Sequence, residues 1–139
     1  MAALSIDRLC RVVCAWLPRV GRLGAAYWLT VPAFVLLMTR FLWPSIHQPA
    51  SMVVVGLMLL VTAVGVQRDR DMALFAVGAA AGIFLEYWGT SRNCWTYYTR
   101  ATPPVEAILA HGFASIAFAR GADLVVAAWH RLRAPAAPA

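Results

Sequence analysis

Four long apolar segments, separated by short polar stretches, constrain most strongly what this chain can fold into. They cover Gly24–Trp43, Met52–Gln67, Met72–Gly89 and the stretch from Val105 to about Leu132. The hydrocarbon core of a bilayer is about 30 Å thick, and about 20 apolar residues cross it as a helix. In lipid a single segment must satisfy its own backbone polar groups, which a helix does. The pattern therefore predicts an all-α membrane protein with about four transmembrane helices.

The composition excludes several other classes of protein. Hydrophobic residues make up 62% of the 139 residues, against about 45–50% in a soluble domain. All twelve basic residues are arginines, and no base-reading motif or aromatic RNA-binding signature accompanies the net charge of +6. We therefore interpret the charge as a topology signal and expect no nucleic-acid partner. Cys10, Cys14 and Cys94 fit neither a disulfide framework nor a four-ligand zinc site.

The chain ends differ in character from the apolar centre. Apolar residues recur at helical spacing from Ile6 to Trp16, whereas Arg8 and Arg11 lie toward another face, and Pro18 stops the pattern. This is typical of an amphipathic helix that lies on the membrane surface. We expect three parts: an interfacial segment over 1–23, a transmembrane domain over 24–132 and a disordered tail over 133–139.

The distribution of arginines predicts the orientation in the membrane. Four spans place both termini on one side, and that side carries Arg8, Arg11, Arg19, Arg22, Arg68, Arg70, Arg131 and Arg133. The opposite side carries Arg40, Arg92 and Arg100. Because positive charge accumulates on the cytoplasmic side, both termini are expected in the cytoplasm. We expect an integral protein of the bacterial inner membrane, in contact with the lipid bilayer.

Several aromatic and charged side chains are assigned structural roles. Tyr27 and Trp28 at one end of the first span, and Trp43 at the other, fit interfacial belts. Arg40 lies one turn from the helix end and can extend to the headgroups.

Charged residues at two further places suggest internal pairing. The sequence Arg68-Asp69-Arg70-Asp71 is interpreted as a polar turn between the second and third spans, with charges that largely cancel. Arg120 and Asp123 are three residues apart, so they are expected to pair on one helical face.

Two glycines in the third span define a close-packing helix face. Gly78 and Gly82 form a GxxxG pattern, which lets another backbone approach closely. Glu86 follows four residues later, on the same face. A carboxylate within a membrane span is costly unless it faces the protein interior. Glu86 is therefore predicted to point inward, next to whatever packs on the glycines.

Two carboxylates flank the polar loop between the third and fourth spans. Glu86 precedes the loop and Glu106 follows it, so both belong to the same leaflet and can converge. An apolar, partly dehydrated site favours the neutral form of a carboxyl. Such a group can act as a general acid near neutral pH. We therefore predict Glu86 and Glu106 as candidate catalytic residues.

The same region is rich in aromatic side chains. The candidate substrate-binding residues are Trp88, Trp95, Tyr97, His111 and Phe113. Aromatic faces attract cations, so carboxyls surrounded by aromatics suit the formation of a carbocation from a hydrophobic alkene. Taken singly, each has an ordinary explanation as a belt or packing residue.

The order of these residues resembles a known family. An acid, then Trp-x-aromatic, then Pro-x-Glu at a helix start is similar to the membrane-embedded lycopene-cyclase-type domain of carotenoid biosynthesis; here it is Glu86, then Trp95-Thr96-Tyr97, then Pro104-Val105-Glu106. The resemblance implies a cyclisation of an isoprenoid end that involves no redox step and no cofactor. It also implies that the chain is at most half of a two-part site. The family usually has Pro-x-Glu-Glu, and Ala107 replaces the second acid here.

Three other functions remain open, one of which is a proton- or ion-conducting path through the membrane carboxylates. The chain fits a small accessory subunit of a larger membrane complex, docking through the Gly78/Gly82 face and the aromatic loop 87–100. His47 and His111 also fit a haem or quinone site. Because four short spans rarely enclose a large ligand, we expect a homo-oligomer or a second membrane subunit.

Overall fold

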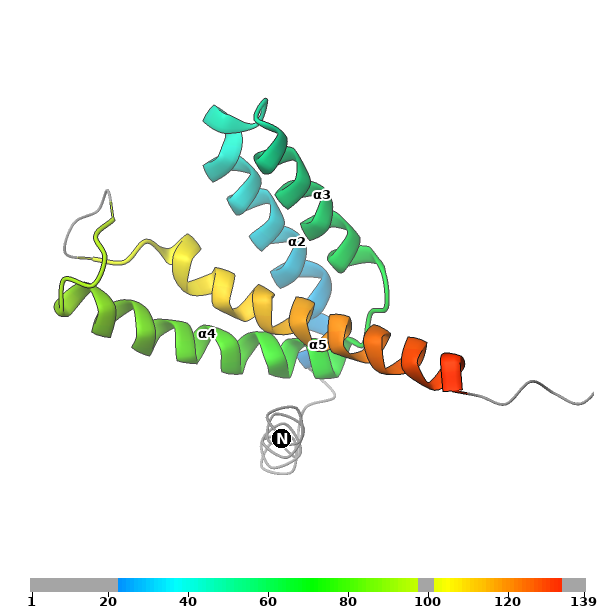
Figure 1. The fold of residues 1–139 in the computed structure, drawn as a ribbon. Coiled ribbons are helices and arrows are strands. Elements are labelled where there is room, and N and C mark those ends of the chain that lie inside the picture. Colours follow the sequence, from blue (N-terminus) through cyan, green and yellow to red (C-terminus); the bar gives the residue numbers. More distant parts are fainter. Residues whose placement is uncertain (1–22, 98–101, 134–139) are drawn as a thin grey trace, which may run out of the picture.

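A computed structural model describes residues 23–97 and 102–133, and within these ranges the fold is entirely helical. The elements are α2 (Leu23–Leu42), the 3-10 turn η2 (Trp43–Ser45), α3 (Pro49–Ala63), α4 (Arg68–Ser91) and α5 (Val105–Arg133) (Figure 1). The predicted all-α membrane fold is confirmed. Three stretches, Gly24–Ser45, Arg68–Ser91 and Val105–Arg133, are long and apolar enough to cross a bilayer. The predicted N-terminal amphipathic helix and the tail beyond residue 133 lie outside the described residues.

Helix α3 is shorter than the predicted second span. It contains 15 residues, which corresponds to about 22 Å at 1.5 Å per residue. Pro49 occupies its first turn, a position where the missing N–H costs nothing. Its last residue is Ala63 and not Gln67, because Val64 is extended and Gly65 has a φ of 70°, a left-handed conformation that glycine adopts readily.

The two helices α2 and α3 form an antiparallel pair. A hydrogen bond between the hydroxyls of Ser45 and Ser51 (3.0 Å) links the turn at one end. At the other end the Tyr27 hydroxyl donates to the Thr62 carbonyl at 2.9 Å. The chain therefore returns along α3 to the level at which α2 begins, although α3 alone is too short for a straight crossing of about 30 Å.

Helix α4 begins earlier than the apolar pattern indicated. Its first turn is the segment Arg68–Asp71, which we had expected to be a polar turn outside the helix. Asp69 and Asp71 in this turn complement the positive end of the helix dipole. The backbone N–H of Gln67 donates to the Asp71 carboxylate at 2.7 Å. The charged tetrapeptide is helical because Asp71 accepts the Gln67 N–H and both acids complement the helix dipole.

Helices α4 and α5 lie side by side and antiparallel (Figure 1). Their contact is lined by glycine: a Cβ added at Gly78 would meet the backbone of His111 and Gly112, and one at Gly82 would meet the Ile108 carbonyl and the His111 ring. The α5 side of this contact is equally close, because a Cβ added at Gly112 would meet the Phe75 carbonyl of α4. The GxxxG face is therefore occupied by α5 of the same chain.

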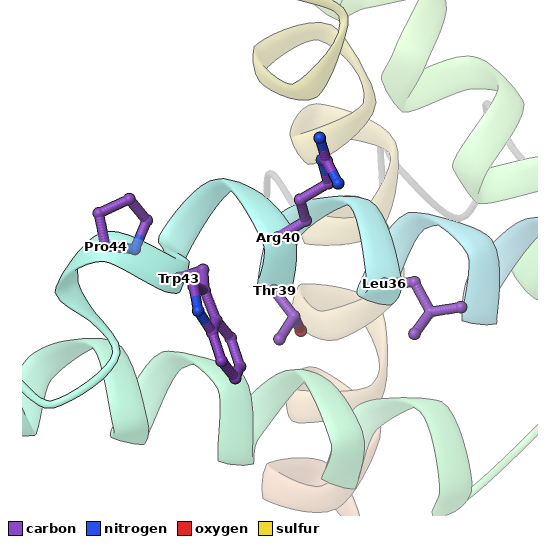
Figure 2. Close-up of a pocket in the computed structure, with 5 residues that line it drawn as sticks. All are labelled: Leu36, Thr39, Arg40, Trp43 and Pro44. Atoms are coloured by element: carbon purple, nitrogen blue, oxygen red, sulfur yellow. The ribbon is translucent and has the colours of Figure 1, made fainter.

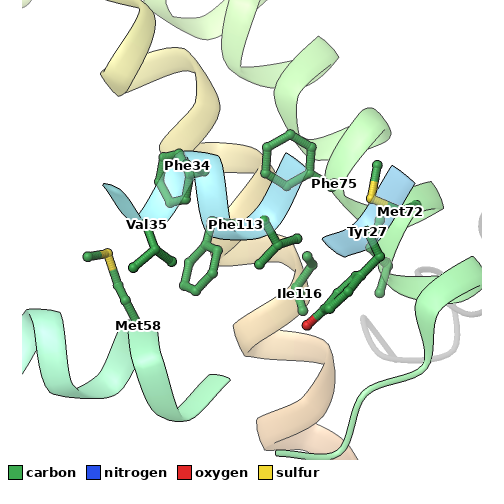
Figure 3. Packing of buried hydrophobic residues seen from close by; sticks show 10 residues of the cluster. Tyr27, Phe34, Val35, Met58, Met72, Phe75, Phe113 and Ile116 are labelled. Carbon is green, nitrogen blue, oxygen red and sulfur yellow. The ribbon is translucent and has the colours of Figure 1, made fainter. Parts of the chain in front are cut away.

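The hydrophobic core lies where α2 crosses α4 and α5 (Figure 3). Phe34 of α2 contacts Phe75 of α4 edge-on, with centroids 6.2 Å apart, and Phe113 of α5 at 5.1 Å. The remaining buried members are Tyr27, Val31, Val35, Met58, Met72, Leu74 and Ile116. This core fixes the start of α2 on the α4–α5 pair. The latter half of α5, beyond residue 120, extends past the other helices and is exposed.

Candidate functional site

The side chain of Glu86 is the centre of a buried polar cluster at the end of α4. Its Oε2 accepts hydrogen bonds from the Trp95 indole N–H at 3.0 Å and from the Tyr97 hydroxyl at 2.8 Å. Its Oε1 lies 2.9 Å from Nε2 of His111. The prediction that Glu86 points inward agrees with this geometry. We call Glu86, Trp95, Tyr97 and His111 the Glu86 cluster.

The end of α4 has the backbone geometry that brings the loop back to Glu86. Asn93 has a φ of 57°, and the N–H groups of Asn93 and Cys94 bond to the carbonyls of Thr90 and Gly89. This is a Schellman motif, in which Asn replaces the more common Gly in the left-handed position. It reverses the chain, so that Trp95 lies over the last turn of the helix.

Gly89 makes room for the returning tryptophan. A Cβ at this position would overlap the Trp95 indole ring. Because the indole lies directly against the helix, its N–H reaches the carboxylate one turn earlier. The local sequence Gly-x-x-x-Asn therefore both ends the helix and supplies the first donor to Glu86.

His111 approaches the carboxylate from α5. Gly82, one turn before Glu86, faces the His111 ring with no side chain between them. The Glu86 side chain is 7% exposed, whereas that of His111 is 38% exposed. When Nε2 carries its proton, the carboxylate orients the ring, and Nδ1 remains available to a second molecule. This is the geometry of a carboxylate–imidazole pair in proton-transfer sites.

Tyr97 lies in the loop after α4 and keeps its proton over the working pH range. Partial burial raises the pKa of its hydroxyl, and the hydrogen bond to the Glu86 carboxylate raises it further, to about 12. A negatively charged phenolate beside a carboxylate is disfavoured for both reasons. Tyr97 therefore acts as a hydrogen-bond donor to Glu86.

The remaining predicted site residues do not bond to this carboxylate. Glu106 has no hydrogen-bond or ion-pair partner among the described residues, and it is only partly buried at the start of α5. Trp88 is 49% exposed on α4. Phe113 is buried in the hydrophobic core against Phe34. The structure thus brings together Glu86, Trp95, Tyr97 and His111, and gives Phe113 a packing role.

A second buried polar cluster was missed by the sequence analysis. Arg120 pairs with Asp71 at 2.6 Å, where Arg120–Asp123 pairing was expected. Asp123 instead contacts Arg70 at the exposed surface, at 2.5 Å. The expected Arg120–Asp123 pair was wrong because the Arg120 side chain reaches toward the start of α4, where Asp71 is 1% exposed.

Further bonds of Arg120 join four helices. Its Nη1 donates to the carbonyls of Val61 and Val64 at the end of α3, and its Nη2 donates to the Tyr27 hydroxyl at 3.0 Å. Tyr27, predicted as an interfacial residue, is 0% exposed. We call Tyr27, Asp71 and Arg120 the Arg120 network. The charged pattern Asp71…Arg120 was visible in the sequence, but nothing local indicated their pairing.

The described residues contain no group of three or more His, Cys, Asp or Glu side chains arranged to hold a metal ion. His47 lies in the turn between η2 and α3, whereas His111 bonds to Glu86 on α5. The imidazole Nε2 of His111 is therefore already engaged by a carboxylate in this structure.

Comparison of the chain with protein-family models, curated proteins and solved structures finds no match. The chemistry of the two clusters is therefore argued from their geometry.

Proposed function

We propose that the protein is an integral membrane enzyme, or half of one, that transfers a proton to the end of a hydrophobic isoprenoid in a non-redox cyclisation of the lycopene-cyclase type. The observation that carries the proposal is the convergence of Trp95, Tyr97 and His111 on the buried Glu86 carboxylate. Ionisable side chains within membrane spans are costly and rare, and they commonly mark functional sites.

The proton donor in this proposal is His111. Glu86 holds Nε2 of the ring, so a protonated ring presents Nδ1–H away from the carboxylate. The His111 side chain is 38% exposed, and the proposal requires that the Nδ1 edge belongs to the exposed part. The Glu86 carboxylate, 2.9 Å from Nε2, is the counter-charge that this proposal assigns to the ring.

The reaction conserves atoms and electrons. A proton from His111 adds to the inner CH carbon of the terminal dimethyl-substituted double bond and leaves a tertiary carbocation on the outer carbon. A neighbouring double bond attacks this cation, which forms one carbon–carbon bond and moves the positive charge to the next carbon. Loss of a proton from an adjacent carbon restores a double bond. The product is an isomer of the substrate, and the released proton returns to the imidazole or to Glu106.

Aromatic side chains beside the cluster support the cationic step. Tyr87, Trp88 and Trp95 are 49%, 49% and 39% exposed around the end of α4. Aromatic faces stabilise cations by roughly 0.5–2 kcal/mol each. In this proposal a hydrophobic substrate that enters from the lipid meets aromatic faces at the end of α4.

The test is expression of the full chain in bacteria that supply linear carotenoids or shorter prenyl substrates. Pigments and lipids are extracted and compared for the wild type, Glu86→Gln, His111→Gln and Glu106→Gln, with the amount of protein in the membrane measured for each. General acid–base groups contribute about 10²–10⁴-fold to rate. We therefore expect a cyclised product from the wild type and a decrease of at least about 100-fold for Glu86→Gln and His111→Gln.

Asp123→Asn is the matched control, because Asp123 is an exposed carboxylate whose partner Arg70 lies outside the cluster. It should retain wild-type product levels. The proposal fails if the wild type leaves every prenyl substrate unchanged, or if Glu86→Gln and His111→Gln retain the product. Loss with Glu106→Gln alone would transfer the acid role to Glu106.

An accessory-subunit function is the main alternative outcome of the same experiment. The Gly78/Gly82 face, proposed from sequence as a docking surface, is covered by α5. A partner would therefore dock on the exposed aromatics Tyr87 and Trp88. Unchanged extracts, together with copurification of the chain in a larger membrane complex, would favour this alternative.

A further inference from the structure

A hollow on the outer side of α2 has no role in the proposed reaction. It has a volume of about 560 Å³ and is lined by Leu36, Thr39, Arg40, Trp43 and Pro44 (Figure 2). These residues come from the last two turns of α2 and from η2, at positions that share one helix face. The hollow therefore lies at one end of a candidate membrane span, outside the Glu86 cluster and the Arg120 network.

The charge in this hollow has no ion-pair partner among the described residues. Arg40 makes no ion pair with any carboxylate in the described ranges, whereas Asp71, Glu86 and Asp123 each have a basic partner or a histidine. Asp69 lies against Gly24, about 24 Å along α2 from Arg40 at 1.5 Å per residue. An arginine near the end of a span extends its guanidinium to the interface, where lipid phosphates are available to it.

The walls of the hollow are apolar. Leu36 is 71% exposed and Trp43 is 67% exposed. The Thr39 hydroxyl already donates to the Val35 carbonyl at 2.7 Å, so it offers no proton outward. Figure 2 shows the Arg40 and Trp43 side chains on two sides of the hollow. The Trp43 indole N–H has no partner among the described residues, and tryptophan at a membrane interface commonly uses this group as a donor.

We propose that this hollow holds the headgroup of an anionic bilayer phospholipid, with the phosphate on Arg40 and the glycerol and first methylenes against Leu36 and Trp43. The guanidinium presents several N–H donors in the planar geometry that phosphate oxygens accept. Trp43 lies about 4.5 Å farther along the helix than Arg40, so the arginine can extend to phosphates at the level of the indole.

The test uses the full chain in nanodiscs of phosphatidylcholine mixed with phosphatidylglycerol. The retained phospholipid is identified by native mass spectrometry after release of the protein. The wild type should retain phosphatidylglycerol in preference to phosphatidylcholine. Arg40→Gln should lower this preference about tenfold, the effect of losing one charge-assisted hydrogen bond, and Arg40→Lys should lower it less.

Two further variants separate a built site from general effects. Arg92→Gln removes an exposed arginine outside the hollow, at the end of α4, and should leave the preference unchanged. Leu36→Trp fills the hollow from its exposed wall and should reduce retention of both lipids. The elution volume and helical circular dichroism of each variant establish that it is folded.

The proposal is overturned if the wild type shows no lipid preference, or if Arg92→Gln lowers it as much as Arg40→Gln. The proposal is also overturned if Leu36→Trp retains as much of both lipids as the wild type does. Excess inorganic phosphate distinguishes the source of the anion: displacement of phosphatidylglycerol would show a site for free phosphate and contradict the lipid assignment. Resistance to phosphate, with loss in Arg40→Gln, supports it.

Discussion

The Glu86 cluster and the Arg120 network both contain residues of α4 and α5, but they differ in how far their side chains are shielded from the surroundings. In the Arg120 network the paired side chains are 9% and 2% exposed, and Tyr27 is 0% exposed. In the Glu86 cluster the carboxylate is 7% exposed, while His111 is 38% exposed. A closed network offers nothing to a second molecule. A partly exposed imidazole in front of a buried carboxylate can contact a second molecule. We therefore assign a structural role to the Arg120 network and propose a chemical role for the Glu86 cluster.

The largest expected effect is the loss of Arg120. Arg120→Gln leaves Asp71 buried without its charge partner and removes donors from the end of α3. Removing one partner of a buried pair costs about 3–5 kcal/mol. We expect a decrease of this size in the free energy of unfolding, measured by denaturant titration in mixed micelles.

The exposed pair Arg70–Asp123 provides the control for that measurement. Asp123→Asn should cost less than about 1 kcal/mol, because surface ion pairs contribute little. A similar loss for both variants would contradict the contrast between a closed network and an exposed pair.

The next effect concerns the glycine contact that supports the Glu86 cluster. Gly82→Ala places a methyl group against the Ile108 carbonyl and the His111 ring, and overpacking of this kind costs about 1–3 kcal/mol. We expect reduced stability and, in product assays, reduced activity, because the ring must move from Glu86. Gly56→Ala meets nothing within 4 Å and should be neutral or stabilised by up to about 1 kcal/mol. Equal stability of the two variants would disprove the close contact.

A smaller effect on stability is expected for Glu86→Gln. The cluster is partly open, so water can replace lost partners, and the net loss should be about 1 kcal/mol. The same variant should lose at least about 100-fold in product formation. A stability loss as large as that of Arg120→Gln would place Glu86 with the structural network.

The smallest effect is the titration of Tyr97. Its pKa is raised to about 12 in the folded protein, so the protonated form is favoured by folding. The stabilising contribution is complete below the ordinary value of about 10 and disappears as the pH rises through about 12. The difference in tyrosinate absorbance between the wild type and Tyr97→Phe should show this late titration. In Glu86→Gln the pKa of Tyr97 should return toward 10. A Tyr97 pKa near 10 in both the wild type and Glu86→Gln would exclude the hydrogen bond.

The periodic and local parts of this structure were predictable from the sequence. The apolar segments gave the four helices, and the start of α5 at Val105 follows Pro103-Pro104 as expected. The position of Glu86 on the Gly78/Gly82 face predicted an inward carboxylate. The return of Trp95 to Glu86 spans nine residues and depends on the turn at Asn93. Such short-range features can be predicted from the types of residue and their spacing in the sequence.

The long-range pairings were not predictable. Arg120 bonds to residues 49 to 93 positions away, and Asp123 was the nearer candidate. The end of α3 was misplaced because Val64 and Val66 continue the apolar pattern beyond the left-handed Gly65. Glu106 and His111 are about 140° apart around α5. This angle alone did not indicate which of the two side chains would contact Glu86. These features depend on how helices cross.

The unequal lengths of α3 and α5 have a consequence for the surrounding lipid. With 15 and 29 residues, they correspond to about 22 Å and 44 Å at 1.5 Å per residue. No uniform bilayer thickness matches both, so lipid must compress beside α3 or the helices must tilt, at a cost of fractions of a kcal/mol per Å of mismatch. Because Arg120 satisfies the carbonyls at the end of α3, that end does not require water. Thinner membrane would reduce the mismatch at α3 and increase that at α5, so we expect the distribution of the protein to depend on bilayer thickness.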